Sequence, residues 1–215
     1  MELVSSVIGW FTDPAHWAGS DGIPNRVGEH LLLSIVAMAV ALTVALPAGL
    51  AIGHTGRAQR VSVAIAGLGR AVPSYALLIL SVGVLGLGIA SALPALVLLA
   101  IPPILVNSAT AIRDVDRDMV EAGRAMGMTE LLILRDVELP PAMPILIAGV
   151  RVATLQVIAT ATLAALVAGG GLGRYIVDGF ALQDDARTVA GAILVATLAL
   201  TTQAVFTVVE RAREK

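Results

Sequence analysis

The chain has 215 residues, of which 57% are hydrophobic and 14% charged, and its mean hydropathy is +0.89. Soluble domains are about half apolar and about a quarter charged, so both values indicate an integral membrane protein. The formal net charge of −2 comes with no basic arm or face, so no nucleic-acid partner is indicated. The absence of cysteine excludes disulfides, zinc thiolate sites and iron–sulfur clusters.

Residues 1–27 mix aromatic and charged side chains and are too polar to cross a membrane. Trp10 and Trp17 stand among acidic residues such as Asp13 and Asp21. A cationic segment followed by a small-residue cleavage site is missing, so no signal peptide is predicted. We expect either a helix or loop in the interface on the outer side of the membrane, where indole rings prefer to lie, or a partly disordered arm.

Five later segments are long and apolar enough to span a bilayer, whose hydrocarbon core of about 30 Å needs about 20 apolar residues. They are residues 28–52, 61–87, 90–112, 142–168 and 189–209. The sequence therefore predicts an all-α, polytopic membrane protein with about five transmembrane helices, and residues 28–210 form its transmembrane domain.

The cationic residues of the short loops predict the orientation, because lysine and arginine are enriched on the cytoplasmic side. One side of the five-span arrangement holds Arg57, Arg60, Arg113, Arg117, Arg124, Arg135, Arg211, Arg213 and Lys215. The other side holds Arg26, Arg174 and Arg187, while Arg70 and Arg151 fall within apolar stretches. We therefore expect the N-terminus outside and the tail 211–215 in the cytoplasm.

Small residues and prolines mark the spans. Gly49 and Gly53 form a pair that allows close helix packing, and tight packing within one subunit is favoured over a dimer seam. Prolines free backbone carbonyls, which must then be buried in protein or face water. This favours a substrate path near the residues Pro73, Ser74, Tyr75, Pro102 and Asn107, although kinks with no transport role are common.

The loop 113–140 is the longest polar stretch on the predicted cytoplasmic side. Asp116 or Asp118 can cap a helix that begins near Arg117, and Gly127 ends it. Thr129 can cap a second helix through about Val137. The prolines Pro140 and Pro141 then start the fourth span. The loop thus predicts a helix pair that lies across the cytoplasmic mouth and can pass a rigid-body push into the membrane; the alternative is a merely structural loop.

Parts of this loop resemble a known motif, namely Glu121-Ala122-Gly123, then Gly127, then Leu139-Pro140. They are similar to the coupling-loop motif of bacterial ABC import permeases, which has Glu-Ala-Ala, a glycine and Leu-Pro. Gly123 replaces the second alanine, a small-for-small change. Segments 71–78, 121–154 and 161–173 also resemble the osmoprotectant uptake branch, which imports glycine betaine, carnitine, choline or proline. The likeness covers roughly residues 28–210.

The resemblance implies a permease of the bacterial cytoplasmic membrane rather than an enzyme. Its loop helix is expected to dock on separate ATPase subunits, with Glu121, Ala122 and Gly127 at the contact. ATP and Mg²⁺ would bind on those subunits, so no cofactor is expected in this chain. Further expected partners are a second permease copy or a homologous permease, an extracytoplasmic solute-binding protein and membrane lipid.

Two arginines depart from an ordinary apolar span. Arg70 departs from the family that the chain resembles, because the resemblance implies a neutral polar residue, often glutamine, before the segment that begins at Val72 and Pro73. A cation at membrane depth usually faces a cavity, so Arg70 is a candidate path-lining residue, or it reaches the cytoplasmic interface. Arg151 poses the same question, and its alternative is a pair with an acidic residue at the inner rim.

Several activities are excluded or disfavoured. A P-loop needs a Gly-Lys-Ser/Thr triplet, and the only lysine is Lys215. The glycine run 169–173 is interpreted as a turn at the outer surface. The histidines His16, His30 and His54 are scattered and predict no metal site. The competing interpretations are an ion-driven carrier, which the absence of paired carboxylates in the spans disfavours, a membrane scaffold, and an ABC permease for methionine or another small amino acid.

Aromatic residues make up 3% of the chain, and within the spans only Tyr75 and Phe206 are aromatic. Quaternary ammonium ligands are held in aromatic cages, so the high-affinity site is expected on the separate binding protein. The outer segment 169–187 and the N-terminal arm are the candidate docking surfaces for that protein.

Overall fold

The structure is a computed structural model that describes residues 2–57, 64, 67 and 73–213. Every regular element among these residues is helical, which confirms the all-α prediction. In chain order they are α1 (Glu2–Thr12), η1 (Pro14–Trp17), α2 (Ile23–Thr55), α4 (Ser74–Leu85), α5 (Ile89–Arg113), α6 (Arg117–Ala125), α7 (Glu130–Leu132), η2 (Ile133–Glu138), α8 (Leu139–Thr160), η3 (Ala161–Val167), α9 (Gly173–Leu182) and α10 (Asp185–Arg213).

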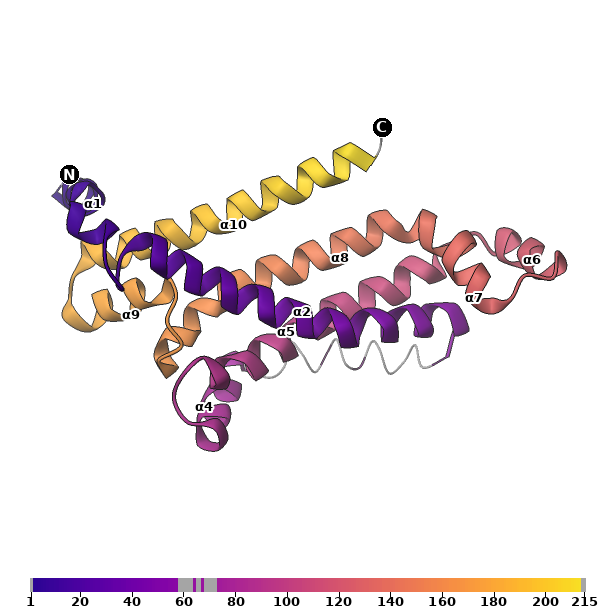
Figure 1. Cartoon of the computed structure of the whole chain (residues 1–215), viewed down its shortest axis with the longest axis horizontal. Helices are drawn as coiled ribbons and strands as arrows, with labels where there is room; N and C mark the ends of the chain where they lie inside the picture. The colour runs from indigo at the N-terminus through magenta and orange to yellow at the C-terminus, as the bar shows by residue number, and fades with distance from the viewer. Residues whose placement is uncertain (1, 58–63, 65–66, 68–72, 214–215) are drawn as a thin grey trace.

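Three long helices, α2, α5 and α8, form the core, and α2 and α5 share the most extensive pairing (Figure 1). Their contact surface is built from leucines and alanines, for example Leu33, Ala37, Leu96 and Ala153. Helices α6 and α7 lie at one end of the bundle, and α1 and α9 lie at the opposite end (Figure 1). The apolar stretch of α10 is not buried within the chain.

Four helical stretches among the described residues are long and apolar enough to cross a membrane. They are α2, α5, Glu130–Val167 and Asp185–Ala212. The predicted span 61–87 lies partly outside the described residues, and its described part is the shorter helix α4, so the count of five stays a prediction. Helix α2 begins at Ile23, before the predicted residue 28, because Gly22 is extended and Pro24 suits the first helical turn.

The N-terminal arm is folded onto the bundle. Helix α1 carries Trp10, which is buried with Ile23, Leu172, Tyr175 and Ala190. The ring of Trp10 also meets Tyr175 edge to face at a centroid distance of 5.2 Å. The arm therefore contains the helices α1 and η1, and its place in the outer membrane interface stays a prediction.

The glycine pair of α2 packs against α5 of the same chain. A β-carbon at Gly49 would stand 2.7 Å from the carbonyl oxygen of Leu105, and one at Gly53 would stand 2.7 Å from that of Ala109. These distances leave no room for a side chain. The interpretation as tight packing within the subunit is confirmed for this pair.

The second loop helix ends close to its predicted place. The segments α7 and η2 end at Glu138, one residue after the predicted Val137, and α8 begins at Leu139 with proline in its first turn. The structure differs in having no break there, because η2 continues directly into α8. The turns of η2 are π-helical, and the N–H of Leu139 bonds to the carbonyl of Leu134. This wider turn accommodates Pro140 and Pro141, which lack the amide donor and would disrupt a regular α-helical turn.

Candidate functional site

The polar segment 116–138, which contains α6, α7 and η2, lies at one end of the bundle, and we call it the α6–α7 element. Local signals in the sequence build it. The carboxylate of Asp116 accepts the N–H of Asp118 at 3.0 Å, so Asp116 rather than Asp118 caps α6. Gly127 follows α6 with φ at +81°, a left-handed conformation that favours glycine. The hydroxyl of Thr129 accepts the N–H of Leu132 and caps α7, as predicted.

The coupling-motif residues divide between the surface and the interior of this element. Glu121, Ala122 and Gly127 are exposed, whereas Gly123 is buried. A β-carbon at Gly123 would lie 3.3 Å from the sulfur of Met128 and 3.5 Å from Ile133. The flexible side chain of Met128 can move enough to admit a methyl group but not a large side chain, so the position accepts only a small residue. One face of α6 is therefore exposed, and the face that carries Gly123 packs on η2.

Leu139 and Pro140 stand where the element enters the bundle. Leu139 packs against an apolar cluster that includes Ile112 of α5, Val120 of α6 and Ile133 of η2, while Pro140 is exposed. The cluster joins the loop helices to the end of α5 and the start of α8. Packed side chains therefore connect α6 with both helices.

An ionic network that sequence reasoning missed runs through this element. The guanidinium of Arg124 donates two hydrogen bonds of 3.0 Å to Glu130, and these raise the pKa of Arg124. Oε2 of Glu130 also lies 3.0 Å from Nε2 of His54. His54 Nδ1 lies 2.6 Å from Oε2 of Glu138, which is fully buried. No local signal pairs His54 with Glu138, because 84 residues separate them.

Among the described residues, the predicted path-lining residues do not lie together in one cluster. Pro73 and Tyr75 are exposed at the start of α4, and Ser74 is half-buried. Pro102 is buried within α5, and the side-chain amide of Asn107 donates to the carbonyl of Pro103 at 2.7 Å. Their role as path-lining residues stays a prediction.

Of the two arginines within predicted apolar stretches, Arg70 and Arg151, the structure describes only Arg151. Arg70 lies outside the described residues. Arg151 donates to Glu210 at 2.8 Å and joins α8 to α10. Of the two interpretations of Arg151, pairing with an acidic residue is therefore the one that the structure has.

At the opposite end of the bundle, a hydrogen bond to a charged side chain of α2 holds the glycine-rich turn 169–173 against that helix. Glu29 accepts the N–H of Gly171 at 2.8 Å and a hydrogen bond of 2.7 Å from Arg26, which also pairs with Asp21. Gly170 and Gly171 both have φ near +76°, as the predicted turn requires. Burial raises the pKa of Tyr175, whose hydroxyl donates to the backbone carbonyl of Asp21.

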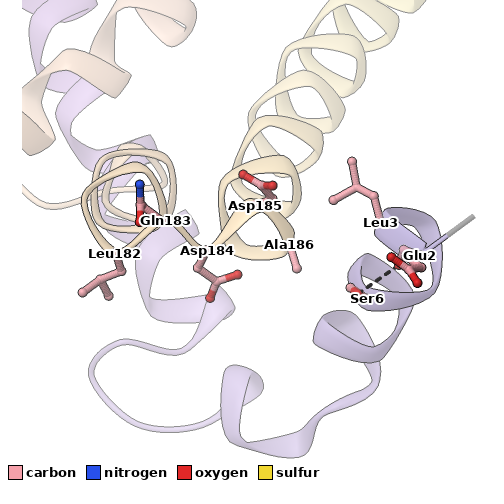
Figure 2. Close-up of a pocket in the computed structure, with 8 residues that line it drawn as sticks. All are labelled: Glu2, Leu3, Ser6, Leu182, Gln183, Asp184, Asp185 and Ala186. Atoms are coloured by element: carbon pink, nitrogen blue, oxygen red, sulfur yellow. Dashed lines mark hydrogen bonds between the residues drawn. The ribbon is translucent and has the colours of Figure 1, made fainter.

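The two segments predicted as docking surfaces meet at this end. Figure 2 shows Glu2, Leu3 and Ser6 of α1 facing the turn from α9 to α10, where Asp184 and Asp185 stand. Between them is an open groove of about 630 Å³, lined by Glu2, Leu3, Ser6, Leu182, Gln183, Asp184, Asp185 and Ala186. Three of these side chains are carboxylates, so the groove is acidic.

A second cavity, of about 360 Å³, lies between α2, α8 and α10 and is mainly apolar. Its hydroxyl groups on Ser34, Thr154 and Thr202 each bond to a carbonyl of their own helix. No cluster of three potential metal ligands occurs in the part of the chain that the structure describes.

The helical bundle with apolar helices of membrane-spanning length, and the polar helix pair at one end of it, define a multi-pass membrane subunit of a transporter. The chain belongs to the family of binding-protein-dependent transport system inner membrane components, whose model matches residues 30–215. It is therefore a component of an ABC importer in the cytoplasmic membrane, a transport subunit rather than an enzyme, whose family works with ATPase and binding-protein partners.

Characterised relatives of this family are similar over most of their length. The glycine betaine/carnitine/choline transport system permease protein OpuCB of Bacillus subtilis is 36% identical over 186 residues, which cover 86% of each chain. The carnitine transport permease protein OpuCB of Listeria monocytogenes is 35% identical, covering 80% of this chain and 79% of that protein. The osmoprotectant import permease protein OsmY of Salmonella typhimurium is 34% identical, covering 80% and 74%.

Solved structures agree in fold. An inward-facing conformation of the MetNI methionine ABC transporter has a TM-score of 0.79 over 94% of this chain and 98% of that chain, at 23% identity. A second crystal form of MetNI has a TM-score of 0.76 at 24% identity, covering 86% and 92%. At this identity the likeness shows the fold and carries no information about the solute.

Proposed function

We propose that this chain forms the translocation path of an ABC importer for an osmoprotectant such as glycine betaine, carnitine, choline or proline. The relatives named for glycine betaine, carnitine and choline, and one named for osmoprotectant import, support the proposal, because their similarity extends over four fifths or more of this chain. The alternative solute, methionine, is suggested only by the likeness in fold to MetNI.

The observation that carries the coupling role is the outward face of the α6–α7 element. Large apolar side chains are uncovered there although the element is polar: Met119 is 50% exposed, and Met126 and Leu131 are each 75% exposed. Flexible methionines beside the charged Glu121 suit a surface pressed against a partner. We propose that this face docks on the ATPase, and that this end of the bundle is cytoplasmic.

The opposite end would then lie outside, with the N-terminus. The acidic groove between α1 and the α9–α10 turn is the surface that we assign to the solute-binding protein. Carboxylates there favour a partner with basic residues at the contact and mainly speed its association. A second permease copy, or a homologous permease, would cover apolar surface such as that of α10.

The test is uptake and ATP turnover in vesicles that contain the permease, its ATPase and its binding protein. Glu121→Lys and Gly127→Asp are expected to insert normally but to lose solute-stimulated hydrolysis and uptake. Normal stimulated hydrolysis in both variants would contradict docking through this face. A panel of labelled betaines, proline and methionine tests the solute, and uptake of methionine alone would overturn the osmoprotectant assignment.

A further inference from the structure

A hydrogen-bonded contact between His54 and the buried Glu138 ties the α6–α7 element to a helix that is not adjacent to it in the chain. The element continues directly into α8 and follows α5 after a short connection, so these two helices receive any movement of it. Helix α2 has no such connection. Yet His54, in the last turn of α2, meets Glu138 at 2.6 Å, and α2 thereby becomes a third helix attached to the element.

The pair belongs to a continuous chain of contacts. Arg124 of α6 holds Glu130 of α7 through two hydrogen bonds, Glu130 contacts one ring nitrogen of His54, and Glu138 contacts the other. We call these four residues the α2 link. Each ring nitrogen of His54 thus has a carboxylate oxygen within hydrogen-bonding distance, so the ring is held from two sides.

Burial makes the pair hard to separate. The Glu138 side chain is fully buried and that of His54 is 12% exposed. The second carboxylate oxygen of Glu138, Oε1, has no hydrogen-bond partner among the described residues. Moving His54 away would leave the buried carboxyl group of Glu138 without a hydrogen-bond partner among the described residues, which is strongly unfavourable. The two residues should therefore move as one body.

Apolar packing beside the pair points the same way. Leu46 and Leu50 of α2 pack on the cluster of Ile112, Val120 and Ile133 that holds α6 against η2. Glu138 itself ends the π-helical segment η2, and π-helical turns occur often at functional sites.

We propose that His54 is a positioning residue for coupling: through the α2 link, a displacement of the α6–α7 element by the ATPase moves the end of α2 together with α5 and α8. The inference rests on the proposed docking of the ATPase on α6. It assigns to His54 and Glu138 a role in force transmission and not in contact with solute or nucleotide.

The test measures solute transported per ATP hydrolysed in vesicles that contain the complete complex. His54→Gln and Glu138→Gln each replace one partner of the contact by an amide side chain of similar size. We expect the ratio to fall on the order of tenfold, which corresponds to the loss of a typical coupling free energy. The ATPase should still copurify with both variants, because the exposed face of α6 is unchanged.

Arg151→Gln is the matched control. It breaks an ion pair, Arg151–Glu210 at 2.8 Å, which is half-buried and joins α8 to α10 without touching the α6–α7 element. The ratio should stay unchanged in this variant. If His54→Gln and Glu138→Gln lower only the yield or thermal stability, and the purified protein keeps the normal ratio, the pair is merely structural and the proposal is wrong.

A reversible chemical cross-link between positions 54 and 138 tests whether coupling can be restored. The chain has no cysteine, so His54→Cys with Glu138→Cys introduces its only two thiols. The native side chains meet at their tips, so a short bis-methanethiosulfonate, which forms one disulfide with each cysteine and can therefore be removed by a reductant, suits the gap better than a direct disulfide. The unlinked double variant should be uncoupled, and linking should restore the ratio until a reductant removes the link. Full coupling without the link, or loss of uptake on linking, would overturn the proposal.

Failure of this inference is distinguishable from failure of the docking proposal. Glu121→Lys tests docking and should reduce copurification of the ATPase. If Glu121→Lys uncouples transport while the α2-link variants behave as the native chain, only the role of His54 is refuted. If Glu138→Gln does not accumulate in the membrane, His54→Gln and the linked cysteine pair decide the question.

Discussion

Gly53 of α2 lies against the carbonyl oxygen of Ala109 in α5 so closely that a β-carbon on the glycine would stand 2.7 Å from that oxygen. The neighbouring pair, Gly49 with Leu105, has the same separation. Since backbone atoms cannot rotate away as a flexible side chain can, these two glycines set how closely α2 and α5 approach.

Gly53→Ala is expected to destabilise the protein by roughly 1–3 kcal/mol, because the extra methyl group forces the two backbones apart. The measurement is the midpoint of thermal unfolding in detergent. Gly28→Ala is the control on the same helix, since nothing lies within 4 Å of its β-carbon position. Equal midpoints for the two variants would show that α2 and α5 adjust without cost.

Gly127 supplies the left-handed turn between α6 and α7. Gly127→Ala should destabilise this turn by about 1–2 kcal/mol, whereas Gly127→Asn should be better tolerated, because asparagine enters this conformation more readily. Copurification of the ATPase with each variant is the readout. The proposed docking predicts weaker association for the alanine variant than for the asparagine variant, and the reverse order would contradict it.

Glu29 accepts hydrogen bonds from both Gly171 and Arg26. Glu29→Ala leaves these two donors without their partner and should cost about 1–3 kcal/mol. Glu29→Gln keeps an acceptor oxygen and should cost less. Limited proteolysis within residues 169–172 is the measurement, and cleavage should be faster in the alanine variant. The same cleavage rate in native and alanine chains would show that Glu29 does not hold the turn.

The acidic groove gives a prediction about the binding protein. The double variant Glu2→Lys with Asp185→Lys reverses the charge of two lining residues and should slow association of the binding protein, with a smaller effect at high salt. Surface plasmon resonance on permease in nanodiscs measures this rate. Arg174→Gln, which lies at the same end but outside the groove, is the control. An unchanged association rate would place the docking surface elsewhere.

The parts of the site that could be predicted depend on residues close together in the chain. Asp116, Gly127 and Thr129 act on their own turns, so their roles as caps and as a helix end follow from residue type and spacing. Pro140 and Pro141 likewise mark the start of α8. The π-helical turns of η2 just before them carried no such local signal.

Other features could not be predicted because they join distant segments. His54 was interpreted as one of three scattered histidines, and Glu138 carried no signal beyond its position before Leu139. Their contact exists only because α2 packs beside α5 and α8. The same reason applies to Glu29 and Gly171, which are 142 residues apart, and to the meeting of α1 with the α9–α10 turn.

The sequence by itself determined that this is an all-helical membrane protein with a polar helix pair, and its motif indicated the family. These properties follow from hydropathy, helix caps and short spacings, which act locally along the chain. Only the tertiary structure decided that α2 contacts the α6–α7 element through His54 and that Arg151 is paired. Both depend on bringing polar side chains from distant helices into contact, at positions where a polar group without a partner is unfavourable.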